Sequence, residues 1–234
     1  MKKIILTCEH AGNKVPTSYK NLFKNYRLLL NTHQGLDIGA LAIAKDLQKH
    51  LKAPLIFSEV TRLLVDLNRF RRSKSLFSEV TAKLSRSEKL QILKEYYEPH
   101  WDQVLTNLKT LHKSGSQIFH IAVHSMTDNL NGQIRNMQLA LLYDPRRPSE
   151  KKFSALWIAE LKIQFPTYKV ARNNPYKGTS EGVTCFSRIQ FNDQSYVGIE
   201  LEINQGLLQA MTVKQRKAFS TKLAHSLKAA VHKL

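Results

Sequence analysis

Short apolar runs alternate along this chain with segments in which apolar residues recur at helical spacing. The apolar runs predict five buried strands, at Lys3–Cys8, Pro54–Ser58, Ser116–Val123, Asn136–Tyr143 and Tyr196–Asn204. The helical spacing predicts helices at Ile38–Leu51, Ser85–His112 and Lys151–Phe165, and a last helix from about Thr212. We expect the longest of these helices to be interrupted near Pro99, because proline lacks the N–H that a helix interior uses.

This alternation predicts an α/β fold with one domain spanning residues 1–234 and a largely parallel or mixed sheet flanked by helices. The sequence contains no internal repeat, low-complexity segment or Gly/Ser linker that would divide it. Ligands of open α/β sheets bind outside the carboxyl ends of the strands. Functional side chains are therefore expected at those ends.

The charge of the chain is strongly positive: 36 Lys and Arg stand against 18 Asp and Glu, a formal charge of +18. Such an excess attracts polyanions whatever the fold. The sequence nevertheless lacks a zinc finger, a helix-turn-helix signature and a basic ribbon interleaved with aromatics, so no specific nucleic-acid partner is expected.

The remaining composition indicates an ordinary globular protein. Two cysteines are too few for the disulfide framework of a small secreted domain, and the first apolar run is too short for a signal peptide. No run approaches the roughly 18 consecutive apolar residues of a membrane-spanning helix. We expect a cytoplasmic protein without a membrane partner.

Side chains able to bind a metal stand at the ends of three predicted strands. Glu9 and His10 follow the first strand, and His124 follows the third. The last strand, YVGIELEIN, carries Glu200 and Glu202 on one face and apolar residues on the other. A carboxylate within a buried strand is costly unless it is paired, hydrogen-bonded or bound to a metal.

A further segment, residues 32–37, adds His33 and Asp37 just before a predicted helix. Two histidines, a carboxylate and a spare glutamate are the residue types of a zinc hydrolase, in which three ligands leave a fourth position for water. The sequence has neither HExxH nor a CxxC pair, and a single His at a strand end is commonly structural. The same ligands also suit manganese, cobalt or iron.

Candidate anion-binding side chains follow the second strand, namely Arg62, Asn68 and Arg69. Arg135 stands in a loop between two later strands, and arginine grips carboxylates bidentately. Asp66 is equally able to pair with one of the nearby arginines in a structural ion pair. The loop at residues 173–178, which includes Asn174, either presents polar groups to a ligand or is an ordinary turn.

Eight segments, in this order, resemble the N-formylglutamate amidohydrolase (N-formylglutamate deformylase) family. They are CEHAGNKVP (8–16), THQGLDIGA (32–40), TRLLVDLNR (61–69), YYEPHW (96–101), VHSM with GQIR (123–126 and 132–135), LLYD (141–144), NNPYKG (173–178) and GIELEINQ (198–205). The resemblance implies an α/β fold similar to zinc-dependent exopeptidases. It also implies hydrolysis of the N-acyl amide bond of a small anionic N-acyl amino acid such as N-formyl-L-glutamate.

The resemblance also implies roles for individual residues. One Zn²⁺ per chain would be held by His10, Asp37 and His124, with Glu9 as the substitute for Asp37. Glu200 would be the general base that takes a proton from the zinc-bound water and passes it to the departing amine. Arg135 would stabilise the reacting carbonyl. The expected substrate-binding residues are Arg62, Asn68, Arg69 and Asn174. The residues expected to orient the ligands or the base are Glu9, His33 and Glu202.

Two positions depart from the pattern that we expect of the family. Thr184-Cys185-Phe186 stands where a histidine is common, and His100-Trp101 replaces a Tyr-His pair. If these positions shape the pocket, a different acyl group or side chain is expected.

An alternative hypothesis is a basic protein that binds nucleic acid or another polyanion without catalysis. Its best support is the segment after Met211, which has six Lys and Arg and no acid. Apolar residues also recur there every four positions, at Phe219, Leu223, Leu227 and Val231. We therefore favour an ordinary amphipathic helix that packs on the sheet.

Overall fold

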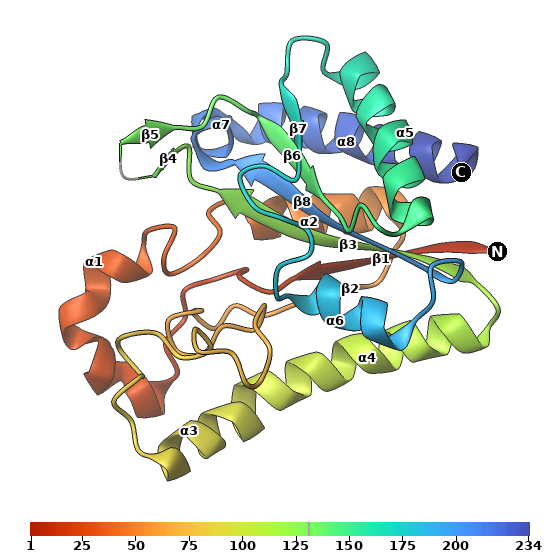
Figure 1. Cartoon of the computed structure of the whole chain (residues 1–234). Coiled ribbons are helices and arrows are strands. Elements are labelled where there is room, and N and C mark those ends of the chain that lie inside the picture. The colour runs from red at the N-terminus through yellow and green to blue at the C-terminus, as the bar shows by residue number, and fades with distance from the viewer. Residues whose placement is uncertain (131) are drawn as a thin grey trace.

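A six-stranded mixed sheet forms the centre of the computed structural model, which describes residues 1–130 and 132–234 (Figure 1). Its strands are β1 (Lys2–Cys8), β2 (Leu55–Phe57), β3 (Gln117–Met126), β6 (Leu139–Leu142), β7 (Val170–Arg172) and β8 (Tyr196–Asn204). They lie in the order β2-β1-β3-β8-β6-β7. The first four in that order are parallel, whereas β6 runs antiparallel to β8 and parallel to β7. The predicted α/β fold with a mixed sheet is confirmed.

Helices surround this sheet. The α-helices are α1 (Arg27–Leu30), α2 (Ala40–Leu51), α3 (Arg86–Ile92), α4 (Glu98–Lys113), α5 (Pro148–Gln164), α6 (Val183–Gln190), α7 (Gln205–Ala210) and α8 (Val213–Lys233). A 3₁₀ segment, η1 (Thr17–Tyr26), precedes α1, and a π-helical turn, η2 (Leu93–Tyr97), joins α3 to α4. A separate pair of short antiparallel strands, β4 (Asn129–Leu130) and β5 (Gln133–Ile134), follows β3. No helix of the described residues is long and apolar enough to cross a membrane.

The two faces of the sheet bury separate apolar cores. Helices α2, α5 and α8 cover one face, where Trp157 and Leu223 pack with the apolar side chains of β8 such as Leu201. The opposite core includes Val104 of α4 and Leu64 of the long segment after β2 (Figure 1). This division leaves the glutamates of β8 on the face opposite α5 and α8.

The predicted interruption near Pro99 is present. The helical stretch changes to the π-helical turn η2 just before Pro99, which lies in the first turn of α4. The backbone stays helical through this turn, in which the N–H of Glu98 donates to the carbonyl of Leu93. The interruption is therefore a local change of hydrogen-bond pattern next to the proline, which has no N–H to donate.

The basic C-terminal segment forms α8. Thr212 caps this helix by accepting a hydrogen bond from the backbone of Gln215, whose side chain accepts one in return from Thr212. Phe219, Leu223 and Leu227 are buried against the sheet and neighbouring helices. The expectation of an amphipathic packing helix is confirmed.

Candidate active site

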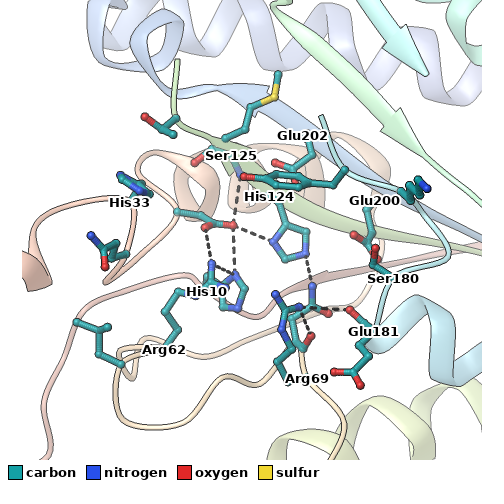
Figure 2. A pocket seen from close by; sticks show the side chains of 18 residues that line it. His10, His33, Arg62, Arg69, His124, Ser125, Ser180, Glu181, Glu200 and Glu202 are labelled. Atoms are coloured by element: carbon teal, nitrogen blue, oxygen red, sulfur yellow. Dashed lines mark hydrogen bonds and ion pairs between the residues drawn. The ribbon is translucent and has the colours of Figure 1, made fainter. Parts of the chain in front are cut away.

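Three side chains able to bind a metal meet beyond the carboxyl ends of β1 and β3. His10 follows β1, His124 lies near the end of β3, and Asp37 precedes α2, with its backbone N–H donating to the carbonyl of His10. One ligand atom from each of the three lies within 4.8 Å of the others. The Asp37 Oδ2 atom is 2.8 Å from Nδ1 of His124 and 3.4 Å from Nδ1 of His10. All three side chains are buried (Figure 2).

The far nitrogen of each imidazole faces another carboxylate. Nε2 of His10 lies 2.7 Å from Oδ1 of Asp66, and Nε2 of His124 lies 3.1 Å from Oε2 of Glu9. Carboxylates placed in this way fix the ring orientation of metal-binding histidines and raise the basicity of the coordinating nitrogen. Both Nδ1 atoms are therefore directed toward Asp37. The set of two imidazoles and one carboxylate fits a divalent metal such as zinc.

Electrostatics within this cluster favour a cation at its centre. Burial opposes ionisation of Glu9, but the hydrogen bonding and charge of His124 outweigh it and lower the pKa of Glu9 to about 2. Burial likewise opposes protonation of His124, yet Asp37 and Glu9 hold its pKa well above the usual value. The charges and hydrogen bonds of His10 and His124 lower the pKa of Asp37, against the same cost of burial. A bound metal would replace this histidine proton as the neutralising charge.

Glu200 and Glu202 point from β8 into the same pocket but have different surroundings (Figure 2). Glu200 accepts a 2.7 Å hydrogen bond from the hydroxyl of Thr184 on α6. Glu202 pairs in register with His124, and its buried Oε2 atom has no hydrogen-bond partner among the described residues. Burial raises the pKa of Glu202 to about 7, with the charges of Asp37 and Glu200 adding to the shift and that of His124 opposing it.

The cavity above these residues has a volume of about 410 Å³, and four of the other predicted residues line it. They are His33, Arg62, Asn68 and Arg69. Arg62 donates a 2.7 Å hydrogen bond to Asp66, and its Nη1 atom lies 3.6 Å from Oδ1 of Asp37. Asn68 lies with Nδ2 at 3.5 Å from His124 Nε2. Arg69 donates to the backbone carbonyls of Asn68 and Glu181.

Two other predicted residues do not line this cavity. The guanidinium of Arg135 lies 5.0 Å from the ring centre of Tyr176 and donates to its hydroxyl and to the carbonyl of Thr127. Asn174 is exposed, whereas its neighbour Asn173 accepts hydrogen bonds from the backbone of Tyr143 and Gly178. Arg135 therefore contacts the pocket only indirectly, through the pocket residue Tyr176. Asn174 is not among the residues that line the pocket.

Sequence reasoning missed several contributors to the site. Asp66 forms the ion pair with Arg62 that the sequence suggested. Its second role, as the partner of His10, has no signal in the sequence. Thr184 was noted as a departure from the family pattern, and the structure places it against Glu200. The cavity wall also includes Tyr176 and Lys177, from the loop at residues 173–178 for which the sequence left a ligand-binding role open. Ser180 and Glu181, which follow that loop and also line the cavity, were not singled out by the sequence.

The second departure, His100, lies buried behind this site. Its Nε2 atom has no hydrogen-bond partner among the described residues, and burial lowers its pKa although the charge of Glu9 opposes that shift. Burial therefore favours the neutral form of this imidazole.

Solved structures similar to this chain include two that share its overall fold. A gene product of Agrobacterium tumefaciens matches with a TM-score of 0.85 and 23% identity, covering 99% of this chain and 91% of that one. An N-formylglutamate amidohydrolase from Ralstonia eutropha JMP134 matches with a TM-score of 0.72 and 18% identity, over 99% and 94% of the two chains. A metallo-carboxypeptidase from Burkholderia cenocepacia is more distant, with a TM-score of 0.44 and 11% identity, over 100% of this chain and 58% of that chain.

Among curated protein sequences, none matches this chain. The family model of N-formylglutamate amidohydrolase, in contrast, matches residues 2–209 of the 234. That match contains every residue of the site described above, from His10 to Glu202. The chain therefore belongs to the N-formylglutamate amidohydrolase family, as its motifs indicated.

Proposed function

We propose that this protein is a metal-dependent amidohydrolase that cleaves the N-acyl bond of a small amino acid, such as N-formyl-L-glutamate. The observation that carries the proposal is the convergence of His10, Asp37 and His124 beneath a pocket, with each imidazole backed by a second carboxylate. The products would be a free carboxylate, formate in the case of an N-formyl substrate, and the amino acid.

The residues that would hold the metal are His10 and His124, through Nδ1, and Asp37. Zinc bound there would supply Lewis-acid polarisation of the acyl carbonyl and would acidify a water molecule. Asp66 and Glu9 would keep the two imidazoles in the orientation that binding requires.

The proton transfer needs a carboxylate that is free to accept a proton from the attacking water. Glu202 fits this role better than Glu200, because its Oε2 atom has no hydrogen-bond partner among residues 1–130 and 132–234 and its pKa is raised to about 7. The same carboxyl group would then donate the proton to the departing amine nitrogen. Glu200, which accepts the hydrogen bond from Thr184, would fix the pocket wall beside it.

Arginines beside the metal-binding group would stabilise the oxyanion that develops in the reaction and would bind the carboxylates of the substrate. Arg62 lies next to Asp37 and His10, so its guanidinium is placed to stabilise the developing oxyanion, the role first expected of Arg135. Arg69 and Asn68 line the cavity and would contact the substrate carboxylates. A volume of about 410 Å³ suits a small acyl amino acid.

The test is hydrolysis of a substrate panel by zinc-loaded protein. The panel would contain N-formyl-L-glutamate, N-formyl-L-aspartate, N-acetyl-L-glutamate and N-formyl-L-leucine, with the acid and the free amino acid both quantified. We expect equimolar release of both products from at least one acidic substrate, and none with His124→Ala. Absence of turnover on the whole panel by folded, zinc-loaded protein would contradict the proposal.

A further inference from the structure

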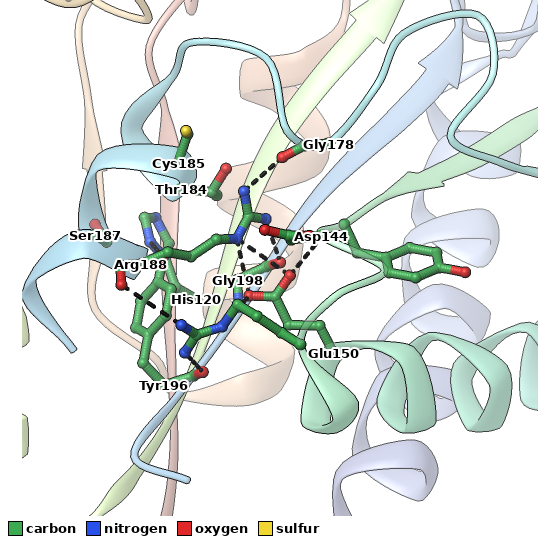
Figure 3. Close-up of polar contacts among 12 residues, drawn as sticks. His120, Asp144, Glu150, Gly178, Thr184, Cys185, Ser187, Arg188, Tyr196 and Gly198 are labelled. Atoms are coloured by element: carbon green, nitrogen blue, oxygen red, sulfur yellow. Dashed lines mark hydrogen bonds and ion pairs between the residues drawn. The ribbon is translucent and has the colours of Figure 1, made fainter. Parts of the chain in front are cut away.

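A buried arginine joins the pocket wall to the strand that carries the two active-site glutamates. The side chain of Arg188, on α6, is 6% exposed and forms an ion pair with Glu150 of α5, which is fully buried (Figure 3). Its Nε donates to both oxygens of Glu150, at 2.9 and 3.1 Å. The rest of the guanidinium remains free to bind other groups.

Those other groups are two backbone carbonyls, one in the loop before α6 and one on β8. Nη1 donates to the carbonyl of Gly178, and Nη2 donates to the carbonyl of Gly198 at 2.9 Å (Figure 3). Gly178 lies in the loop whose residues line the cavity on both sides of it, Tyr176 and Lys177 before it and Ser180 and Glu181 after it. Gly198 lies on β8, two residues before Glu200.

The loop packs closely at this point. A Cβ atom on Gly178 would lie 2.0 Å from the backbone nitrogen of Tyr143, so only glycine allows the loop to approach β6 this closely. The backbone N–H of Gly178 also donates to the side chain of Asn173. Arg188 thus binds the carbonyl of Gly178, whose position is restricted by its close contact with Tyr143 and by its hydrogen bond to Asn173.

The helix of Arg188 contacts the site at two more points. Thr184, one turn before Arg188, donates to Glu200, and the backbone N–H of Val183 donates to Oδ1 of Asn68 at 2.8 Å. Residues four apart lie on the same face of a helix. A shift of α6 relative to β8 would therefore disturb the contacts of α6 with Glu200 and Asn68 as well as the position of the pocket loop.

We propose that Arg188 is a positioning residue that holds the loop at residues 173–182 and helix α6 in register with β8, and thereby sets the substrate-binding geometry of the pocket. This inference rests on the proposed amidohydrolase function. The planar fork of arginine is needed, because one side chain must reach Glu150 and two carbonyls at once. Lysine would preserve the charge beside Glu150, but its single ammonium group lacks the separate planar N–H donors of a guanidinium.

The variant Arg188→Lys tests this inference, with Arg147→Lys as the matched control. Arg147 is also a mostly buried arginine beside Glu150, 3.3 Å from it. Its other contacts are Asp193, the carbonyls of Arg188 and Phe191 at the end of α6, and the carbonyl of Tyr196 at the start of β8, and none of them lies in the loop at residues 173–182. Both variants keep a positive charge near Glu150. Only Arg188→Lys removes the link to Gly178.

Two readouts separate positioning from general stability. Hydrogen exchange of residues 173–182, measured by mass spectrometry, needs no substrate, and we expect faster exchange there in Arg188→Lys but not in Arg147→Lys. On the best substrate, we expect Arg188→Lys to raise KM and to lower kcat/KM by about 10- to 100-fold. A purely structural defect would reduce the folded fraction, which lowers the apparent kcat without changing KM.

The outcomes are distinguishable. Exchange in the loop that matches the Arg147→Lys control, or an unchanged KM in Arg188→Lys, would overturn the inference about Arg188. A wild-type protein that hydrolyses no N-acyl amino acid would overturn the proposed function, and loop exchange would still decide whether Arg188 anchors the loop. Should Arg188→Lys not fold, the double variant Glu150→Gln/Arg188→Gln removes both charges of the buried pair while Arg147 keeps Asp193 as its partner, and the same contrast in exchange is expected.

Discussion

Glu200 and Glu202 are two residues apart on β8 and face the same pocket, but their partners give them different chemistry. Glu200 accepts a hydrogen bond from Thr184, whereas one buried oxygen of Glu202 has no hydrogen-bond partner in the part of the chain that the structure describes. Alternation along the strand predicted that both would share a face. It could not predict that Thr184 contacts Glu200, because that contact depends on how α6 packs against β8.

Replacement of each glutamate by glutamine separates these roles. We expect Glu202→Gln to retain the metal and to lose about 10²- to 10⁴-fold in kcat, because a general base is removed. Glu200→Gln, the matched control on the same strand face, should cost less in kcat. Steady-state kinetics with metal analysis decides the assignment, and a larger loss of kcat in Glu200→Gln would restore Glu200 as the base.

Asp66 orients His10, so its neutralisation should weaken metal binding without removing a ligand. We expect Asp66→Asn to reduce zinc affinity by about 10- to 100-fold. Asp193→Asn is the control, since Asp193 contacts Ser149 and Arg147 away from the site. Competition with a chromophoric chelator measures both affinities, and equal affinities in the two variants would show that Asp66 does not support the ligand.

The three predicted metal ligands meet in the structure. His10 and His124 do so because the ends of parallel strands lie at one edge of the sheet, and Asp37 because its backbone N–H bonds to the carbonyl of His10. The side-chain partners of the imidazoles were not predictable. Asp66 comes from an irregular segment after β2, whose path depends on its packing beneath the sheet rather than on any periodic pattern. Arg135 was placed by motif alone, and its stacking on Tyr176 depends on a loop distant in sequence.

At the scale of elements, periodicity predicted the long helices and the buried strands well. It could not predict that β6 runs antiparallel to β8, because an apolar run carries no information about strand direction. The short elements α6 and β7 were also missed. They are eight and three residues long, which is too short for a hydrophobic period to stand out.

Helix α8 provides a test of local stability. Thr212 and Gln215 form a reciprocal cap at its first turn, and the helix packs against α5 and α2. We expect Thr212→Ala to lower the free energy of unfolding by about 1 kcal/mol. Thr106→Ala, at an exposed position within α4, should change it by less than about 0.5 kcal/mol. Denaturant unfolding measures both, and equal effects would argue against the cap.

At the scale of the whole molecule, the formal charge of +18 predicts weak, salt-sensitive attraction to polyanions. The six Lys and Arg of α8 lie on a helix whose apolar face is already buried in the core. Composition alone therefore could not separate an enzyme from a polyanion-binding protein. The buried cluster of His10, Asp37 and His124 does so, because binding of a polyanion at the surface does not need it.

Protonation and metal binding should compete throughout the neutral range. The raised pKa of His124 stabilises the metal-free fold below the unfolded-state pKa of about 6.5, and this contribution is lost as pH rises through the raised value. Zinc requires the unprotonated imidazole, so its affinity increases with pH. We expect the gain in Tm from zinc to grow between about pH 6 and about pH 8, as measured by calorimetry. A gain that shrinks over this range would contradict the assigned ligands.

The zinc dependence of turnover tests the central claim most directly. Protein stripped with a chelator would be titrated with zinc while hydrolysis of the best N-acyl amino acid is followed, alongside His124→Ala. We predict no turnover in stripped protein and full recovery at about one zinc per chain, with neither zinc uptake nor activity in the variant. Full turnover by metal-free protein, or a folded wild type that takes up no zinc, would contradict the account.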